Sequence, residues 1–138
     1  MKFLVDANAL SELTKPDPVA RVIDWLRTND RDSVVNPIIL GELEYGILLL
    51  PAGRRKRRLL DWFNEGIRTL EVIAIDAETS SIWAKLLSDM SRKGRSMPLG
   101  DSLIAASAIQ HGLTVVTRNV AHYRYARVNV VNPLEPID

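Results

Sequence analysis

The chain has 138 residues, 46% of them hydrophobic, and a formal net charge of +1, values ordinary for a single globular domain with a core. Cysteine is absent and only two histidines occur, which excludes disulfides, thiolate zinc sites and cysteine nucleophiles and argues against a histidine-rich zinc site. Because the net charge is small, any nucleic-acid binding would have to come from a local basic patch.

The first half of the chain is predicted to alternate short strands with helices. Apolar residues 3–5 form a strand that stops at Asp6. The pattern then predicts, in chain order, a short helix at 9–13, a helix N-capped by Asp17 with Pro18 at its first position, a strand at 33–35 and a helix from Asn36 to about Leu50.

The second half continues this alternation. It is predicted to contain, in order, an amphipathic helix at 54–70, a strand at 72–75, a helix capped by Asp76, a helix from about Leu99 to His111 closed by Gly112, and strands at 114–117 and 128–131. Because several strands are uniformly apolar, the alternation predicts an α/β fold, a parallel sheet with helices on both faces, in one domain spanning residues 1–138.

No segment predicts export or membrane insertion. The first residues lack the apolar stretch of a signal peptide. The most apolar region, 37–51, contains Glu42 and Glu44 and is too short to span a bilayer. A cytoplasmic location without membrane contact is therefore expected.

Four oxygen-bearing side chains stand where the hydrophobic pattern predicts burial or a strand end: Asp6, Glu42, Asp101 and Asn119. Buried acids are costly unless they are paired or bound to a cation. Residues at the carboxyl ends of parallel strands gather at one edge of the sheet, where ligands bind. Three acids meeting there would require a hard divalent cation, and ligation by oxygen alone indicates Mg²⁺ or Mn²⁺.

Each of these residues also has a plainer interpretation. Asp6 is explained as the cap of the helix that follows it, Asp101 as the N-cap of a helix starting at Ser102, and Asn119 as a turn residue. Glu42 is placed by a helical wheel in the middle of an apolar face, so capping does not explain it, although a buried arginine or lysine would pair with it. The functional interpretation therefore depends on the combination.

Four segments in order carry a family resemblance: residues 5–13 (VDANALSEL), 41–47 (GELEYGI), 98–106 (PLGDSLIAA) and 116–119 (VTRN). Over nearly the whole chain they resemble PIN-domain ribonucleases, in particular the VapC-type toxins of bacterial toxin–antitoxin pairs. The resemblance implies a three-layer α/β/α sandwich around a parallel sheet and RNA cleavage that depends on Mg²⁺ or Mn²⁺. It also implies a homodimer and a small antitoxin protein as partner.

The resemblance assigns roles to individual positions. Asp6, Glu42 and Asp101 match the acidic metal-site positions, and Asn119 matches a catalytic polar residue. The residues expected beside the site, where they would support the metal ligands or position the substrate, are Asn8, Thr117, Arg118 and His122. Members of the family often have a further acid where His122 stands, and this departure puts a second metal in doubt.

The densest charge run comprises Arg54, Arg55, Lys56, Arg57 and Arg58. A solvated helix start is the favoured interpretation. Five cations at a helix N-terminus nevertheless oppose the macrodipole, which suggests contact with RNA phosphates or with an acidic antitoxin segment. A basic rim nearer the acids is expected from Arg92, Lys93, Arg95 and Arg118.

Two other functions compete with that of a toxin ribonuclease. A catalytically weakened RNA- or protein-binding module would keep the fold, and His122 in place of an acid favours it. A phosphate-transfer domain would use Asp6 as its nucleophile and would need a second acid two residues later, where Asn8 stands.

Overall fold

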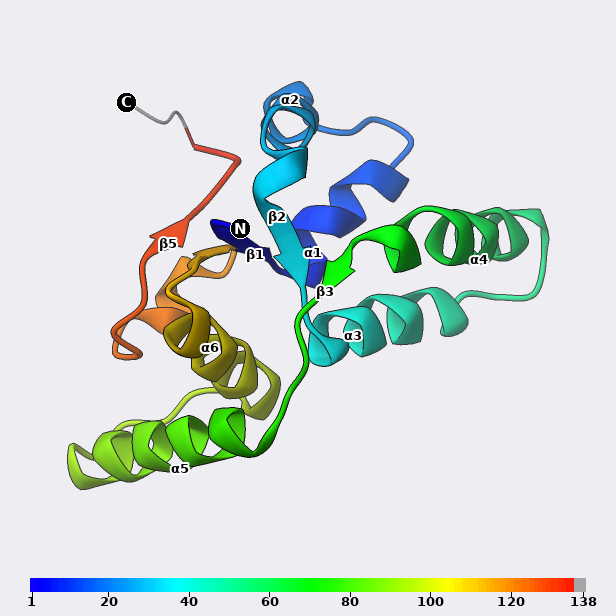
Figure 1. Cartoon of the computed structure of the whole chain (residues 1–138). Helices are drawn as coiled ribbons and strands as arrows, with labels where there is room; N and C mark the ends of the chain where they lie inside the picture. The colour runs from blue at the N-terminus through cyan, green and yellow to red at the C-terminus, as the bar shows by residue number, and fades with distance from the viewer. Residues whose placement is uncertain (136–138) are drawn as a thin grey trace.

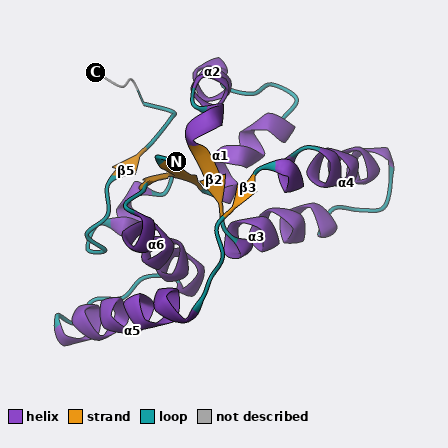
Figure 2. Cartoon of the chain, in the orientation of Figure 1, coloured by secondary structure: helices purple, strands orange, loops and turns teal. Residues whose placement is uncertain are grey.

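The structure is a computed structural model that describes residues 1–135 of the chain. Its centre is a sheet of five parallel strands in the order β3-β2-β1-β4-β5 (Figures 1 and 2). The strands are short: β1 (Phe3–Val5), β2 (Ser33–Val35), β3 (Glu71–Val72), β4 (Thr114–Val116) and β5 (Val130–Val131). The predicted α/β fold with a central parallel sheet is therefore confirmed. The predicted extent of the single domain, 1–138, stays a prediction, since residues 136–138 lie outside the described part.

Six α-helices connect the strands: α1 (Ala7–Leu10), α2 (Ala20–Thr28), α3 (Pro37–Leu48), α4 (Arg54–Glu65), α5 (Ala77–Arg92) and α6 (Leu99–His111). Short 3₁₀ turns extend or join them, namely η1 (Ser11–Thr14), η2 (Asp30–Asp32), η3 (Ile67–Thr69) and η4 (Val120–Tyr123). Figure 1 shows α3 beside α4 and α5 beside α6 as two separate pairs.

The order of the strands shows where a ligand-binding crevice is expected. The chain moves outward from β1 through β2 to β3, and then returns to place β4 on the other side of β1. Since crossovers between parallel strands are right-handed, α1 to α4 cover one face of the sheet and α5 and α6 the other. The topological switch point thus lies between the carboxyl ends of β1 and β4, where α/β proteins bind ligands.

The three central strands are apolar on both faces because both faces are covered. Leu4, Val35, Val115 and Val116 are fully buried, as expected for a parallel sheet between two helical layers. The edge strand β3 is shorter than the predicted 72–75, because β2, its neighbour in the described part of the chain, ends at Val35. A last backbone bond, from Ile73 N to Val35 O at 2.8 Å, closes that pairing.

Three predicted helices have other boundaries in the structure. The short helix predicted at 9–13 is α1, which ends at Leu10, followed by η1. The second helix begins at Ala20 with Val19 at the N-cap, whereas Asp17 with Pro18 was predicted to start it. The Val19 amide donates instead to the Glu12 carboxylate, a contact across seven residues. The predicted helix 54–70 ends at Glu65, because Gly66 turns the chain into η3. Across residues 1–135 no helix is long and apolar enough to cross a membrane.

Candidate active site

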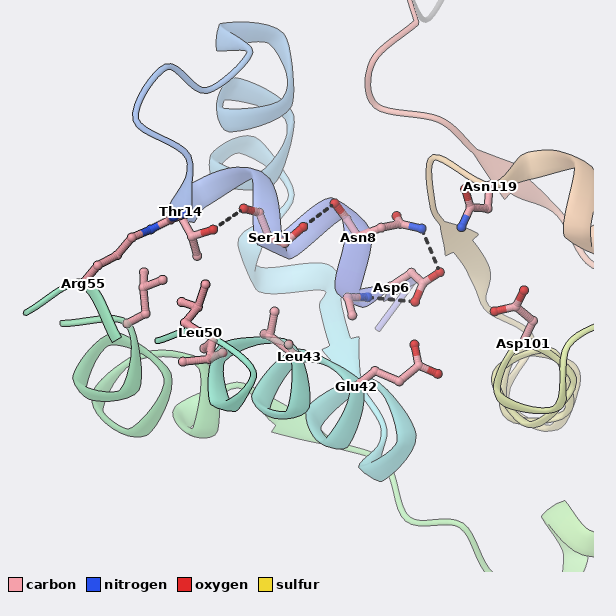
Figure 3. Close-up of a pocket in the computed structure, with 14 residues that line it drawn as sticks. Asp6, Asn8, Ser11, Thr14, Glu42, Leu43, Leu50, Arg55, Asp101 and Asn119 are labelled. Carbon is pink, nitrogen blue, oxygen red and sulfur yellow. Dashed lines mark hydrogen bonds between the residues drawn. The ribbon is translucent and has the colours of Figure 1, made fainter. Parts of the chain in front are cut away.

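Three carboxylates from distant parts of the chain face one groove at the switch point. The groove has a volume of about 400 Å³ and is lined by Asp6, Glu42 and Asp101 together with Asn119. Figure 3 shows these side chains turned toward a common space at one end of the groove, with Arg55 at the other end. We call this feature the acidic groove. The structure thus brings together the four residues that the sequence singled out.

Asp6 follows β1 directly and is only 3% exposed. Its Oδ1 accepts a hydrogen bond from the Ala7 amide at 2.8 Å, so it does cap α1. Its Oδ2 accepts one from the Thr117 hydroxyl at 2.9 Å. Burial raises the pKa of the Asp6 carboxyl, the bonds from Thr117 and Ala7 oppose this rise, and the charge of Asp101 adds to it. Asp6 is therefore a helix cap and also one of the acids that face the groove.

Asn8 and Thr117 hold Asp6 in place. The Asn8 amide nitrogen donates to Thr117 Oγ1 at 3.0 Å and lies 3.4 Å from Asp6 Oδ2. Asn8 Oδ1 accepts from the Arg118 backbone amide at 3.0 Å, which ties α1 to the residue after Thr117. The Asn119 amide donates to Thr117 Oγ1 at 3.1 Å. Asn8 and Thr117 thus lie beside the acids, as the resemblance predicted.

Glu42 reaches the acidic groove, but its predicted burial is wrong. The buried stripe of α3 is Ile39, Leu43 and Ile47, whereas Glu42 is exposed. Nearly every side of α3 carries apolar residues, so the helical wheel does not identify the buried one. Partial burial raises the pKa of Glu42, and the charges of Asp6 and Asp101 raise it further.

Asp101 lies within the first turn of α6 and is not its cap. The helix begins at Leu99 after an N-cap at Pro98, so the interpretation of Asp101 as the N-cap before Ser102 is wrong. The Asp101 carboxylate is 2.7 Å from Nδ1 of His122. His122 therefore touches an acid of the groove at the position where an acid was expected.

Gly100 allows the two helices that carry Glu42 and Asp101 to approach each other. A Cβ at Gly100 would overlap Oε1 of Glu42 and would lie 3.7 Å from Cγ2 of Ile38. The missing side chain thus leaves room for the Glu42 carboxylate beside the start of α6. The sequence singled out no role for this glycine, although it directly precedes Asp101.

Arg118, which was predicted to lie at the rim of the acids, contacts a different carboxylate. The Arg118 side chain lies 3.7 Å from Glu12 Oε2, and Lys15 Nζ lies 2.8 Å from the same oxygen. Glu12 is 1% exposed, and the bond from Lys15 followed by that from Val19 lowers the pKa of its carboxyl. Arg118 is therefore engaged by an acid that the sequence analysis did not select.

The run 54–58 forms the first turns of α4. Arg55 lines the acidic groove, and Lys56 donates to the Leu48 carbonyl at the end of α3 at 2.9 Å. Arg54, Arg57 and Arg58 are exposed, as a solvated helix start requires. One member of the run thus faces the groove, and another caps a neighbouring helix.

Three further residues near the site were not predicted from the sequence. Ser11 and Thr14 line the groove between Asn8 and Arg55. Their regular spacing of three from Asn8 is the signal that would have identified them. Tyr123 is 2% exposed, and its hydroxyl has no hydrogen-bond partner within residues 1–135. Burial, and then the charges of the three groove acids, raise the pKa of this phenol.

The donor set of the groove fits a hard divalent cation. It offers carboxylate and amide oxygens without thiols, the ligands that Mg²⁺ and Mn²⁺ prefer. As they are placed in the described part of the chain, no three acidic or histidine side chains are close enough together to hold a metal ion. Burial is the largest cause of the raised pKa values of Asp6 and Glu42, and a cation would relieve the repulsion among the acids that adds to it.

The fold and the groove define an α/β protein with an acidic site at the switch point of its sheet. A family model described as the PIN domain matches residues 3–128, and the chain belongs to this family. The resemblance predicted from the sequence is therefore confirmed.

Individual relatives match over nearly their full length. Toxin FitB of Neisseria gonorrhoeae is 34% identical over 135 residues, which cover 95% of this chain and 97% of that protein. VapC ribonuclease Y4jK of Sinorhizobium fredii is 29% identical over 138 residues, with coverages of 97% and 99%. In the solved structure of FitAB bound to an IR36 DNA fragment, one chain matches with a TM-score of 0.91 at 31% identity, with coverages of 99% and 98%.

Proposed function

We propose that this protein is a metal-dependent endoribonuclease that acts as the toxin of a toxin–antitoxin pair. The observation that carries the proposal is the meeting of Asp6, Glu42 and Asp101 in one groove at the switch point of a PIN fold. Relatives that match along the whole chain are named a VapC ribonuclease and a toxin. RNA is the proposed substrate.

Asp6, Asp101 and Glu42 would hold Mg²⁺ or Mn²⁺. A bound divalent cation supplies charge neutralisation at the phosphoryl group and lowers the pKa of a coordinated water. Thr117 and Asn8 orient Asp6 through their hydrogen bonds. Asn119, at the rim of the groove, is placed to contact the substrate. The proposed products carry 5′-phosphate and 3′-hydroxyl ends.

The proposal is tested by incubating the purified protein with a mixed RNA pool and Mn²⁺, with and without EDTA, and mapping the cut ends. Asp101→Asn and Glu42→Gln are expected to fold but to lose Mn²⁺ binding by calorimetry and RNA cleavage. Glu44→Gln, which removes a charge from the same helix without lining the groove, is the matched control. Full cleavage by Asp101→Asn, or cleavage that persists in EDTA, would refute the proposed site.

A weakened RNA- or protein-binding module is the second candidate. The contact between His122 and Asp101 favours it, because a histidine occupies a place where the family often supplies a further acid. A protein of this kind would show no heat of Mn²⁺ binding and would bind RNA without cutting it.

The partner proposed for this chain is a small antitoxin protein. The match to the FitAB structure, which contains more than the toxin component, supports such a partner. Co-expression with the product of an adjacent small gene, followed by size-exclusion chromatography, tests this proposal. The expected homodimer stays a prediction. Size-exclusion chromatography of the chain expressed alone would test it.

A further inference from the structure

A second hollow lies between the end of α5 and the turn that follows η4. Its volume is about 280 Å³, and it is lined by Met90, Lys93, Arg95, Arg124, Tyr125 and Arg127. We call it the basic cleft. None of these residues lines the acidic groove, and none belongs to the run 54–58.

The basic cleft carries more positive charge than its surroundings neutralise. Four of its lining side chains are cations, and Asp89 is the carboxylate near them, 3.2 Å from Lys93 Nζ and 3.9 Å from the Arg127 guanidinium. Within residues 1–135, Arg95 and Arg124 have no carboxylate within ion-pair distance. Cations gathered in this way repel one another and attract an anion.

The ring of Tyr125 lies against one of these cations. The guanidinium of Arg95 lies 3.5 Å from the centroid of the Tyr125 ring, and that of Arg124 lies 5.9 Å away. A hydrogen bond from Arg124, and then the charge of Arg95, lower the pKa of the Tyr125 phenol. A guanidinium stacked on a ring keeps its N–H groups free at its edge, in the fork geometry that matches a phosphate.

The basic cleft is connected to the acidic groove by one short segment. Asn119 lines the groove, His122 in η4 contacts Asp101, and Arg124 follows two residues later. A 3₁₀ segment rises about 2 Å per residue, so Asn119 and Arg124 are separated by about 10 Å. A nucleic-acid strand carries one phosphate per nucleotide, so a short stretch of a single strand can reach from the acidic groove to the basic cleft.

We propose that the basic cleft binds a backbone phosphate of the RNA strand a few nucleotides from the bond that is cleaved. Arg95 and Arg124 are the phosphate ligands, and Tyr125 is a positioning residue that orients Arg95. This inference rests on the ribonuclease function proposed above. It adds the direction in which the RNA strand leaves the acidic groove. Contact with phosphate is independent of base sequence, so the cleft contributes affinity and not base recognition.

The test measures binding of an end-labelled single-stranded RNA oligonucleotide by fluorescence anisotropy in EDTA, at several salt concentrations. The double variant Arg95→Ala/Arg124→Ala is expected to bind roughly a hundredfold more weakly, about tenfold for each charge-assisted hydrogen bond removed. The slope of log affinity against log salt should become shallower by roughly 0.7 for each phosphate that the variant no longer neutralises. Arg27→Ala/Arg31→Ala removes the same charge from exposed positions in α2 and η2 and should change neither quantity comparably.

Two substitutions at one position separate the role of the ring from that of general packing. Tyr125→Phe keeps a face for Arg95 and should bind RNA like the wild type, whereas Tyr125→Leu should bind several-fold more weakly. With Mn²⁺ present, the arginine double variant should cleave with a raised KM and an unchanged kcat.

Unchanged affinity and salt slope in the arginine double variant overturn the inference and leave the ribonuclease proposal intact, as does an equal loss in the Arg27/Arg31 control. An acidic peptide whose binding depends on Arg95 and Arg124 while RNA binding does not assigns the cleft to a protein partner and also overturns it. Conversely, RNA binding that depends on both arginines in a protein that never cleaves RNA supports the cleft and refutes the ribonuclease.

Discussion

Gly100→Ala tests whether the approach of α6 to Glu42 matters for the site. The new Cβ would overlap Glu42 Oε1, while its next neighbours, at 3.5 and 3.7 Å, are in ordinary contact. Because the overlapping atom ends a flexible and exposed side chain, folding requires only that Glu42 rotate away. The substitution should therefore displace a proposed metal ligand and leave the fold intact.

The expected changes in stability and activity have opposite signs. Alanine is the better helix former by about 0.5–1 kcal/mol, so the free energy of unfolding should stay the same or rise by up to that amount. For a chain of this length, such a gain raises Tm by roughly 2–4 °C. Mn²⁺ affinity and the cleavage rate should fall by about 10–100-fold, the usual effect of disturbing the support of a metal ligand. Urea unfolding, Mn²⁺ calorimetry and initial cleavage rates measure the three quantities.

Gly41→Ala is the matched control. Gly41 precedes Glu42 in α3, and a Cβ there would meet no atom within 4 Å. This variant should gain helix stability and keep wild-type Mn²⁺ affinity. If Gly100→Ala keeps full Mn²⁺ affinity and activity, the position of Glu42 does not depend on Gly100. If it loses stability along with activity, the Cβ disturbs more than one side chain, and the argument fails.

Two further predictions concern buried polar groups. Glu12→Gln removes the charge beside Lys15 and Arg118 and should lower the free energy of unfolding by roughly 2 kcal/mol at neutral pH. Because the pKa of Glu12 is lowered, its stabilisation exists above the usual glutamate range and disappears as pH falls through the lowered value, so urea titrations should show the gap closing in acid. A gap that stays constant with pH would contradict this assignment. Tyr123→Phe removes a hydroxyl that has no partner in the described part of the chain, and should raise the free energy of unfolding by about 1 kcal/mol; a decrease of that size would show that the phenol has a partner.

The features that the sequence predicted correctly depend on short-range patterns. Uniformly apolar runs such as Val34–Val35 identify strands that are buried on both faces, and the alternation with helices then determines a parallel sheet. Asp6 was placed correctly because it ends a strand, and the carboxyl ends of parallel strands share one edge of the sheet. Caps at Asn36 and Asp76 were visible because each side chain bonds an amide three residues later.

The features that it missed depend on contacts between distant residues. The start of α2 was misplaced because Glu12 binds the Val19 amide, which no capping rule anticipates. The orientation of α3 was misjudged because apolar residues surround the helix and only packing selects Ile39, Leu43 and Ile47 as the buried side. Arg118 was assigned to the rim of the acids because its partner, Glu12, lies more than a hundred residues earlier in the chain.

The placement of Arg118 also bears on the raised pKa values of Asp6 and Glu42, which burial raises most. Within residues 1–135, neither Asp6 nor Glu42 has a lysine or arginine within ion-pair distance, and the nearest candidate from the β4 end is held by buried Glu12. Had Arg118 turned toward Asp6, it would have lowered the pKa of that carboxyl and occupied the place of a cation. With Arg118 beside Glu12, no lysine or arginine pairs with Asp6 or Glu42 within residues 1–135, and uncompensated negative charge attracts cations. The arrangement separates a negative centre from cations that stay available on its flanks, which suits a substrate that is itself a polyanion.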